Sequence, residues 1–362
     1  MKKGKCRILM IAPAKEVKGG MTAVVSTLMD GIEQSTEYTV DFFPAYKDKF
    51  NSIGKILYSI GRLFLFLFAV QKYDLFHLHS AAYGSFYRKS IYVWICRAFQ
   101  KKVVFHMHGS RFEKFHNSSN FNRLIIKKTL DRVDAVIVLS QQMEALARDY
   151  CGNERIYILK NPIAMPELHE IPKRSLPEDR KVQLLFMGEI GKRKGVYDIV
   201  DTVRCMPPEM QSRVVFNVCG NNEVDKLRAL VKEGKIEESF RISDWVQGEE
   251  KKQLLINSDI YILPSYHEGL PVSILEAMSC LLPVISTDAG GIPEIVKDGY
   301  NGIIVKPGDI EAIKDAVIKL VSDEETRVCF GKNGRQLVEE YEVKNVIKEL
   351  SDIYVKTMGM GG

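Results

Sequence analysis

The chain has 362 residues, of which 46% are hydrophobic, 27% charged and 9% aromatic. These are the proportions of an ordinary globular protein, and they exclude collagen-like, intrinsically disordered and disulfide-scaffold classes. The net charge of +5 is divided unevenly: residues 1–180 carry 28 basic and 17 acidic side chains (net +11), and residues 181–362 carry the remaining 23 and 29 (net −6). The two halves are therefore expected to meet different ligands, although independent drift of surface charge would give the same split.

Short apolar runs alternate with longer amphipathic segments along the chain. Most positions of the runs are apolar, without a strict alternation of apolar and polar residues, which is typical of strands buried on both faces of a parallel sheet. Expected strands are residues 7–12, 40–43, 75–78, 103–107, 135–139, 156–159, 184–187, 214–219, 260–263, 283–286 and 302–305. Expected helices are residues 21–33, 121–130, 142–150, 196–206, 223–233, 249–257 and 310–321. This order predicts an α/β protein with two doubly wound, Rossmann-like domains.

The N-terminus and the cysteines predict a cytoplasmic protein. The apolar run at residues 8–13 is too short for the hydrophobic region of a signal peptide and ends in turn residues, so a buried first strand explains it better. The seven cysteines are odd in number and include no C-x-x-C pair. We therefore expect a reducing compartment, without disulfides or structural zinc.

The most apolar segment is residues 53–70. Lys55 and Arg62 interrupt it and leave an unbroken run of only residues 63–70, well short of the roughly 20 residues that span a bilayer. Two interpretations remain, a helix buried against a sheet or an interfacial helix with its basic residues at the lipid headgroups. The second, together with the basic first half, predicts peripheral attachment to an anionic membrane surface.

Histidines end two neighbouring expected strands, at His77 and His79 and at His106 and His108. Two histidines on one face of a strand would permit a metal ion. Because no Asp, Glu or Cys lies nearby in the sequence to complete a set, we expect no metal here. One histidine is expected to work in the site through hydrogen bonds, while the others satisfy backbone groups.

A proline-rich, non-periodic segment at residues 162–179 predicts a linker. The expected domains are residues 1–165 and 166–340, followed by a C-terminal helix at 341–362 that packs back toward the first domain. Parallel sheets bind ligands beyond their carboxyl ends. We therefore expect the ligand site in the cleft between the two domains.

A basic turn follows the expected strand at 184–187, with Lys192, Arg193 and Lys194 between two glycines. Cations at such a turn would stabilise the charge of a departing phosphate; a solvated basic turn is the alternative. The spacing is not that of a Walker motif, and no strand is followed by G-x-G-x-x-G. A dinucleotide-dependent oxidoreductase is therefore disfavoured.

Two glutamates flank the start of the helix expected after residue 270. Gly269 and Pro271 suit a helix N-terminus, which favours phosphate. Glu276 lies inside the helix among apolar residues and needs a partner. Because carboxylates repel phosphate, the expected partners of Glu268 and Glu276 are hydroxyls. Hydroxyls beside phosphate indicate a sugar nucleotide; the alternative is an exposed Glu276 on a surface helix.

These motifs together resemble the retaining, GT-B-fold glycosyltransferases of family four. The resemblance covers nearly the whole chain and depends on Glu268-x7-Glu276, on the segment 288–296 with Gly290 and Gly291, and on Gly188-x6-Gly195 with Lys194. It implies that Glu276 binds the ribose diol of a nucleoside diphosphate, and that Glu268 with Gly269, Leu270 and Pro271 holds the sugar being transferred.

The resemblance also assigns roles elsewhere in the chain. It implies that Gly19 and Gly20 face the donor phosphates, and that His108 lies near the transferred sugar as a hydrogen-bonding group. The segment 244–248 resembles the one over which such enzymes lay the nucleotide base. Lys194 matches the family's lysine, but Glu189 stands where the family usually has arginine. We expect Arg193 to reach the diphosphate instead; the alternative is a weakened site.

The function that the resemblance implies is metal-independent transfer of a sugar, with retention, from a nucleotide sugar to an acceptor hydroxyl. The expected acceptor is a glycan or lipid-linked glycan in bacterial surface polysaccharide, lipopolysaccharide or capsule synthesis, and no nucleic acid is expected to bind. A nucleotide-sugar epimerase and a glycan phosphorylase share the two-domain form. A non-catalytic partner subunit that binds the nucleotide sugar is also allowed, because of Glu189.

Overall fold

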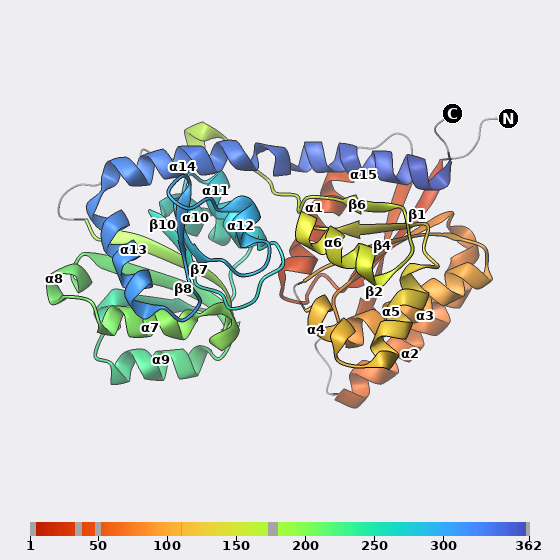
Figure 1. Cartoon of the computed structure of the whole chain (residues 1–362), viewed down its shortest axis with the longest axis horizontal. Coiled ribbons are helices and arrows are strands. Elements are labelled where there is room, and N and C mark those ends of the chain that lie inside the picture. Colours follow the sequence, from red (N-terminus) through yellow and green to blue (C-terminus); the bar gives the residue numbers. More distant parts are fainter. Residues whose placement is uncertain (1–4, 33–37, 48–51, 110, 173–179, 360–362) are drawn as a thin grey trace. The chain divides into compact units, whose positions relative to one another are not determined.

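The computed structural model describes residues 5–32, 38–47, 52–109, 111–172 and 180–359. The chain forms two compact units (Figure 1): unit 1 comprises Met1–Pro162 and Val343–Gly362, and unit 2 comprises Ile163–Glu342. Each unit contains a six-stranded sheet in which all paired strands are parallel. The part of the expected linker at residues 173–179 lies outside the described residues.

The sheet of unit 1 has the order β2-β1-β3-β4-β5-β6. The order reverses between β1 and β3, and ligands of such sheets bind beyond the carboxyl ends of the strands at this point. The strands are β1 (Cys6–Pro13), β2 (Tyr38–Tyr46), β3 (Leu75–Ser80), β4 (Lys102–Met107), β5 (Ala135–Val138) and β6 (Ile156–Ile158).

Helices cover both faces of this sheet, which is why β3 and β5 are buried at every position. The last helix, α15, comes from the end of the chain and packs on the first strands, where Tyr354 meets Tyr38 edge to face at 5.4 Å between ring centroids. The helices are α1 (Gly20–Ile32), α2 (Ser52–Ala69), η1 (Val70–Lys72), α3 (Gly84–Ala98), α4 (Phe112–Asn117), α5 (Asn120–Leu130), α6 (Gln141–Tyr150) and α15 (Val343–Met358).

The sheet of unit 2 has the order β12-β11-β10-β7-β8-β9. In order of occurrence within the unit this is 6-5-4-1-2-3, the doubly wound arrangement of dinucleotide-binding folds, with its reversal between β7 and β10. The strands are β7 (Val182–Ile190), β8 (Val214–Asn222), β9 (Phe240–Ser243), β10 (Ile260–Leu263), β11 (Val284–Thr287) and β12 (Gly302–Val305).

The helices of unit 2 connect these strands and cover the sheet (Figure 1). They are η2 (Leu168–Glu170), η3 (Lys192–Lys194), α7 (Val196–Arg204), α8 (Pro208–Gln211), α9 (Val224–Glu233), η4 (Glu237–Ser239), α10 (Gly248–Asn257), α11 (Val272–Ser279), α12 (Ile292–Ile295), α13 (Ile310–Ser322), α14 (Glu324–Val338) and η5 (Glu339–Tyr341).

The predicted fold class, two Rossmann-like doubly wound domains, is confirmed. All eleven expected strands occur near their expected positions. One strand was not predicted, β9, whose Phe-Arg-Ile-Ser sequence alternates apolar and polar residues over only four positions at a sheet edge. A run that short carries no signal that separates it from a loop.

Helix α2 is the expected apolar segment, and it is buried on one face only. Phe66 is fully buried and packs edge-on against Phe76 and Tyr92, at 5.4 and 4.7 Å between ring centroids. The outward face exposes Ile56, Leu57, Ile60, Phe64, Leu65, Leu67 and Phe68. Arg62 was expected at a lipid headgroup layer if the helix were interfacial, but it turns inward over the ring of Phe43, 3.8 Å away.

The sheet therefore covers the inner face of α2 and leaves its outward face exposed. Among the described residues, no helix combines the length and the apolar character needed to cross a bilayer.

Candidate functional site

The loops after β7 and β10 meet at the reversal point of the unit 2 sheet and bring a lysine onto a glutamate. Lys194, in the η3 turn after β7, forms an ion pair with Glu268, in the loop after β10. The two side chains are 14% and 8% exposed. The hydroxyl of Ser265 donates a second hydrogen bond to the same carboxylate oxygen at 2.8 Å. Glu268 is therefore held from two sides.

Gly195 permits the close approach of these two loops. It has a left-handed φ of +71°, and a Cβ there would lie 1.9 Å from the carbonyl oxygen of Pro264. The backbone N–H of Tyr266 donates to the carbonyl of Arg193 at 2.9 Å, which ties the loops together directly. Any side chain at position 195 would separate Lys194 from Glu268.

A third loop, after β11, packs against the backbone of Glu268 and Gly269. Gly290 has φ +58°, and a Cβ there would lie 1.9 Å from the carbonyl oxygen of Glu268. The N–H of Gly291 donates to the carbonyl of Gly269 at 2.8 Å. The two glycines of the 288–296 motif thus serve as a close-packed base for the loop that carries Glu268.

Arg193 is paired with the residue that replaces the expected arginine. Its Nη2 donates to Oε2 of Glu189 at 2.6 Å, and its Nη1 lies 3.4 Å from the carbonyl oxygen of His267. Glu189 and Arg193 therefore neutralise each other. For Arg193 to bind a phosphate, this ion pair has to open.

Glu276 lies on α11 and binds a lysine that was not predicted from the sequence. Lys251, on α10, donates to Oε1 of Glu276 at 2.6 Å. The glutamate side chain is 19% exposed, so it is neither on an open surface nor fully buried. The protein's own partners of the two glutamates are Lys251 for Glu276, and Lys194 with the hydroxyl of Ser265 for Glu268; the ligand hydroxyls expected at both glutamates stay a prediction. No spacing in the sequence links α10 to α11, so Lys251 could not be found from it.

The unit 2 residues together offer both kinds of group that a sugar nucleotide requires. Lys194 and Arg193 supply cations for phosphate, while Glu268 and Glu276 can accept hydrogen bonds from hydroxyls. Leu270 and Pro271 are buried and hold the start of α11 against the sheet. These cations and carboxylates are paired with one another or with neighbouring charged side chains.

Gly19 and Gly20 lie beyond the carboxyl end of β1, at the reversal point of the unit 1 sheet. Helix α1 begins at Gly20, and the N–H of Ala23 donates to the carbonyl of Gly19 at 3.2 Å. A Cβ on either glycine would meet no heavy atom within 4 Å. This loop therefore borders open space, with room for a ligand to approach its backbone.

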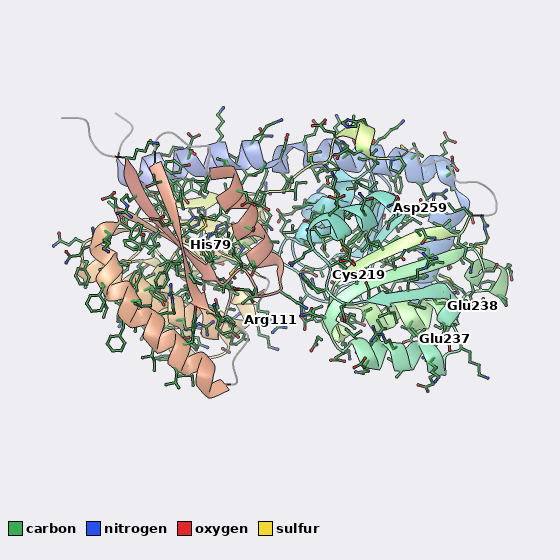
Figure 2. The ribbon with its side chains drawn as sticks, turned by 180° about the vertical axis from the view of Figure 1, so that it is seen from behind. His79, Arg111, Cys219, Glu237, Glu238 and Asp259 are labelled. Carbon is green, nitrogen blue, oxygen red and sulfur yellow. The ribbon has the colours of Figure 1, made fainter. Side chains whose placement is uncertain are left out.

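His108 follows β4 and is buried with three other histidines, His77, His79 and His106, which we call the histidine quartet. Its backbone N–H donates to the carbonyl of Ser80 at 2.7 Å, and its Nε2 lies 2.8 Å from Nδ1 of His79. Burial lowers the pKa of His108 to about 3, so its ring is neutral at pH 7. His79 lies among the strands of unit 1 in Figure 2.

The expectation that the other histidines satisfy backbone groups is wrong, because their ring nitrogens meet side chains. Nδ1 of His77 lies 2.7 Å from the hydroxyl of Tyr354, and its Nε2 lies 3.3 Å from Nδ1 of His106. The rings of His106 and His108 stack at 4.1 Å between centroids. The quartet is thus one connected array that sequence spacing on single strands does not reveal.

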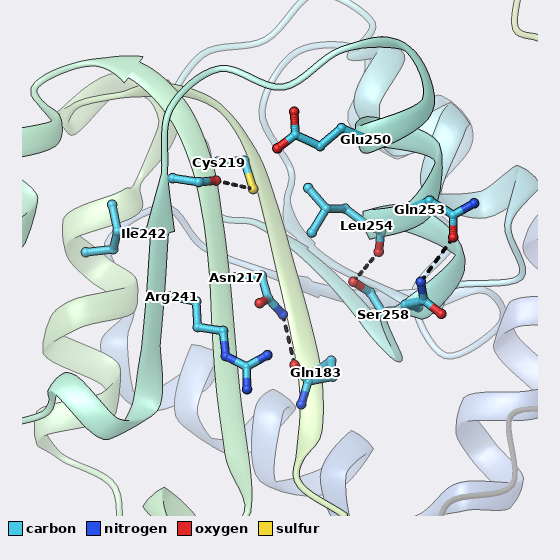
Figure 3. A pocket seen from close by; sticks show the side chains of 11 residues that line it. Gln183, Asn217, Cys219, Arg241, Ile242, Glu250, Gln253, Leu254 and Ser258 are labelled. Atoms are coloured by element: carbon cyan, nitrogen blue, oxygen red, sulfur yellow. Dashed lines mark hydrogen bonds between the residues drawn. The ribbon is translucent and has the colours of Figure 1, made fainter.

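A pocket of about 470 Å³ lies elsewhere in unit 2, between the β8 and β9 strands and helix α10 (Figure 3). Glu250 and Leu254 of α10 face Cys219 and Asn217 of β8 across it. It contains none of the residues predicted for the site. It ends at Ser243, next to the segment 244–248 that we expected under the nucleotide base.

Both parts of the chain match models of glycosyltransferase families. Residues 169–337 match Glycosyl transferases group 1, and residues 19–165 match Glycosyltransferase Family 4. Among curated proteins, an uncharacterized glycosyltransferase of Methanocaldococcus jannaschii is 27% identical over 241 residues, which is 65% of this chain and 61% of that protein. The O-antigen chain mannosyltransferase B of Escherichia coli is 26% identical over 56% of this chain and 54% of that protein.

Solved structures of low sequence identity share the fold over nearly the full length. Sucrose-phosphate synthase from Thermosynechococcus elongatus matches with a TM-score of 0.80 at 18% identity, covering 99% of this chain and 100% of that one. The Anabaena protein HepE in complex with UDP-glucose matches with a TM-score of 0.74 at 17% identity, covering 97% and 99%. The chain shares the two-domain fold of these structures, and each of its halves matches a glycosyltransferase family model.

The similarity to glycosyltransferases extends to both units, since one model matches residues 19–165 and the other residues 169–337. The chain spans about three fifths and about half of the two curated relatives named above. The positions of Lys194, Glu268 and Glu276 fall in the part that matches group 1, and those of Gly19, Gly20 and His108 in the part that matches family 4.

Proposed function

We propose that this glycosyltransferase moves a sugar from a nucleoside-diphosphate sugar to an acceptor hydroxyl, with retention of configuration and without a metal ion in the transfer step. The observation that carries the proposal is the pairing of Lys194 with Glu268 at the reversal point of the unit 2 sheet. A cation for the leaving diphosphate and a carboxylate for the sugar hydroxyls are adjacent there. The HepE complex with UDP-glucose, a structural neighbour, supports a donor of this class.

We assign the donor contacts residue by residue. Glu276 accepts hydrogen bonds from the ribose diol, and Lys251 positions that carboxylate. Glu268, with the backbone of Gly269, Leu270 and Pro271, binds the sugar. Lys194 and Arg193 bind the diphosphate, whose charge grows as the bond to the sugar breaks. Gly19 and Gly20 offer backbone N–H groups to the phosphates, and His108 is a neutral hydrogen-bonding group for the sugar.

The transfer proceeds on one face of the sugar. The bond from the anomeric carbon to the diphosphate oxygen breaks with its electron pair leaving on that oxygen. The acceptor oxygen then bonds to the same carbon from the same side, and the acceptor proton passes to the leaving phosphate. Glu268 is a poor nucleophile for a covalent route, because Lys194 and Ser265 both donate to it.

We propose a glycan or lipid-linked glycan as the acceptor, in the synthesis of bacterial surface polysaccharide. The Escherichia coli relative is named an O-antigen chain mannosyltransferase, which supports this class of product. An assay over such acceptors separates three outcomes. Acceptor-dependent release of nucleoside diphosphate supports transfer, donor conversion without acceptor supports an epimerase, and binding without turnover supports a non-catalytic subunit.

The ribose assignment is tested by thermal shift with the Glu276→Ala variant. Free nucleoside diphosphates and their sugars, each with uracil, guanine or adenine, are screened against the wild-type protein. A donor at 100 times its Kd adds about 2.7 kcal/mol of stability, and we expect the variant to lose most of this shift. Glu238→Ala, which changes an exposed glutamate of η4, is the control and keeps the full shift. An undiminished shift in Glu276→Ala would rule out the ribose role.

We further propose that α2 attaches the protein to an anionic membrane on its cytoplasmic side. Its outward face presents aromatic and aliphatic side chains to solvent, and Phe68 is 78% exposed. The exposed Lys72 follows the helix, and Lys101 donates to the carbonyl of Gln71 at 3.2 Å, so two cations lie at its end. Apolar insertion plus headgroup attraction is the arrangement of an interfacial helix.

Replacing Phe64 and Phe68 together with serine is expected to weaken binding to vesicles at least tenfold. Each inserted phenylalanine contributes about 1.5–3 kcal/mol when it leaves water. Binding is measured by co-sedimentation with vesicles of phosphatidylglycerol and phosphatidylethanolamine at low and high salt. Phe121→Ser changes an equally exposed phenylalanine of α5 and should bind as the wild type does. If salt and the α2 substitutions both leave binding unchanged, the attachment is not through α2.

A further inference from the structure

Three histidines of the quartet present nitrogen atoms to one another in the interior of unit 1. One ring nitrogen from each of His77, His79 and His106 lies within 4.8 Å of the other two, and the three residues are buried. They come from adjacent strands, since His79 of β3 is directly opposite His106 of β4 in the sheet. The strand pairing therefore supplies the third ligand that neither strand has alone.

Two nitrogens of this group have no partner among the described residues. Nε2 of His79 and Nε2 of His106 are both buried and unbonded. A neutral imidazole has one donor and one acceptor, so either tautomer leaves a buried polar atom unsatisfied at each ring. Buried polar atoms of native proteins nearly always have a partner. An ion bound to Nε2 of His79 would supply the partner that this ring lacks.

The remaining hydrogen bonds of the rings fit the second layer of a metal site. Nδ1 of His77 lies 2.7 Å from the hydroxyl of Tyr354, and Nδ1 of His79 lies 2.8 Å from Nε2 of His108. When both Nδ1–H groups donate outward, the Nε2 atoms of His77 and His79 carry free lone pairs. Metal-binding histidines are oriented in this way, through the nitrogen that does not bind the metal.

The distance between His77 and His106 also suits a shared ion. Nε2 of His77 and Nδ1 of His106 are 3.3 Å apart, which is long for a hydrogen bond. Two ligands at tetrahedral zinc, with Zn–N distances of about 2.0–2.1 Å, lie about 3.3–3.4 Å apart. The ligand nitrogen of His79 lies within 4.8 Å of the ligand nitrogens of His77 and His106.

We infer that His77, His79 and His106 bind one transition-metal ion of the Zn²⁺ class, with water or hydroxide as the fourth ligand. Three imidazoles suit zinc, copper, iron or nickel rather than magnesium or calcium. The expectation of no metal considered one strand at a time and required an acidic or thiol ligand. The ion would hold β3 to β4 and fix the ring of His79, which in turn orients His108.

The charge around the site favours an ion that carries hydroxide. Lys89 is buried in the same unit and interacts electrostatically with His79. A hydroxide ligand halves the charge of a divalent ion. The inference is independent of the proposed function, because no donor group is assigned to the metal.

Metal content is the direct test. Untagged protein is purified without chelator, and metals are measured by plasma mass spectrometry; we expect about one ion per chain. His79→Gln and His106→Gln should each hold less than a tenth of that amount, and glutamine at position 79 retains an amide donor toward His108. His169→Gln changes an exposed histidine in unit 2 and should keep the wild-type content.

A second measurement does not depend on how well the variants fold. Wild-type protein stripped of metal and loaded with Co²⁺ is expected to show the strong visible absorption of four-coordinate cobalt, and Zn²⁺ should raise its Tm. Absence of metal as purified, together with no cobalt spectrum and no Tm shift, would overturn the inference and leave a buried water as the bridging ligand. Equal metal content in the wild type and both quartet variants would also overturn it.

Discussion

Glu268→Gln is expected to lower kcat by roughly 100- to 1,000-fold, the range found when one group that stabilises a transition state is removed. Glutamine keeps the shape of the side chain and can still bond to Ser265. It removes the charge that holds Lys194 and weakens hydrogen bonds from the sugar hydroxyls. The measurement is the initial rate of nucleoside-diphosphate release with saturating donor and acceptor.

The matched control is Glu189→Gln, the same substitution in the neighbouring loop. Glu189 forms an ion pair with Arg193 and is about half exposed, so its loss should change kcat less than tenfold. If Arg193 has to leave Glu189 to bind phosphate, this variant should bind donor slightly more tightly. If kcat falls by the same factor in both variants, Glu268 does not contribute more to the reaction than Glu189 does.

Gly290→Ala is expected to destabilise the protein by more than about 3 kcal/mol and to weaken donor binding. A left-handed backbone costs a residue with a Cβ about 1–2 kcal/mol, and the new Cβ would also collide with the carbonyl of Glu268. Relief of that collision moves the loop that carries Glu268. Stability is measured by urea denaturation, and binding by titration with the donor found in the thermal-shift screen.

Gly299→Ala separates the two contributions. Gly299 has a similar φ of +69°, but a Cβ there would meet no atom within 4 Å. The free energy of unfolding of this variant should fall by about 1–2 kcal/mol, the cost of the left-handed backbone alone. The variant should bind donor as the wild type does. If the two alanine variants are equally stable, Gly290 does not have the close contact described here.

The architecture was predictable because it depends on a pattern that repeats along the chain. The largely apolar runs at buried strands such as 214–219 and 260–263 are recognisable as strands without further context. The edge strand β9 is not, since half of its residues are polar. Gly290 and Gly291 were recognised as part of a motif, but only the packed structure shows that they contact the backbone of Glu268 and Gly269.

The site was predictable where its residues are neighbours in sequence and hidden where the fold assembles them. Glu268 and Glu276 could be placed at a helix start from composition alone. Lys251 reaches Glu276 from another helix, and the histidine quartet is assembled by the pairing of two strands. Such partners depend on sheet order and register, which a single sequence does not encode in any short spacing.

The return of α15 to unit 1 makes that unit discontinuous in the chain. Unit 2, residues 163–342, is a single stretch and can complete its sheet as soon as it leaves the ribosome. Unit 1 must wait for the last residues, since Tyr354 meets both Tyr38 and His77. During synthesis the histidine quartet therefore remains without one of its partners until the chain is finished, and a chain that ends early leaves that partner missing for good.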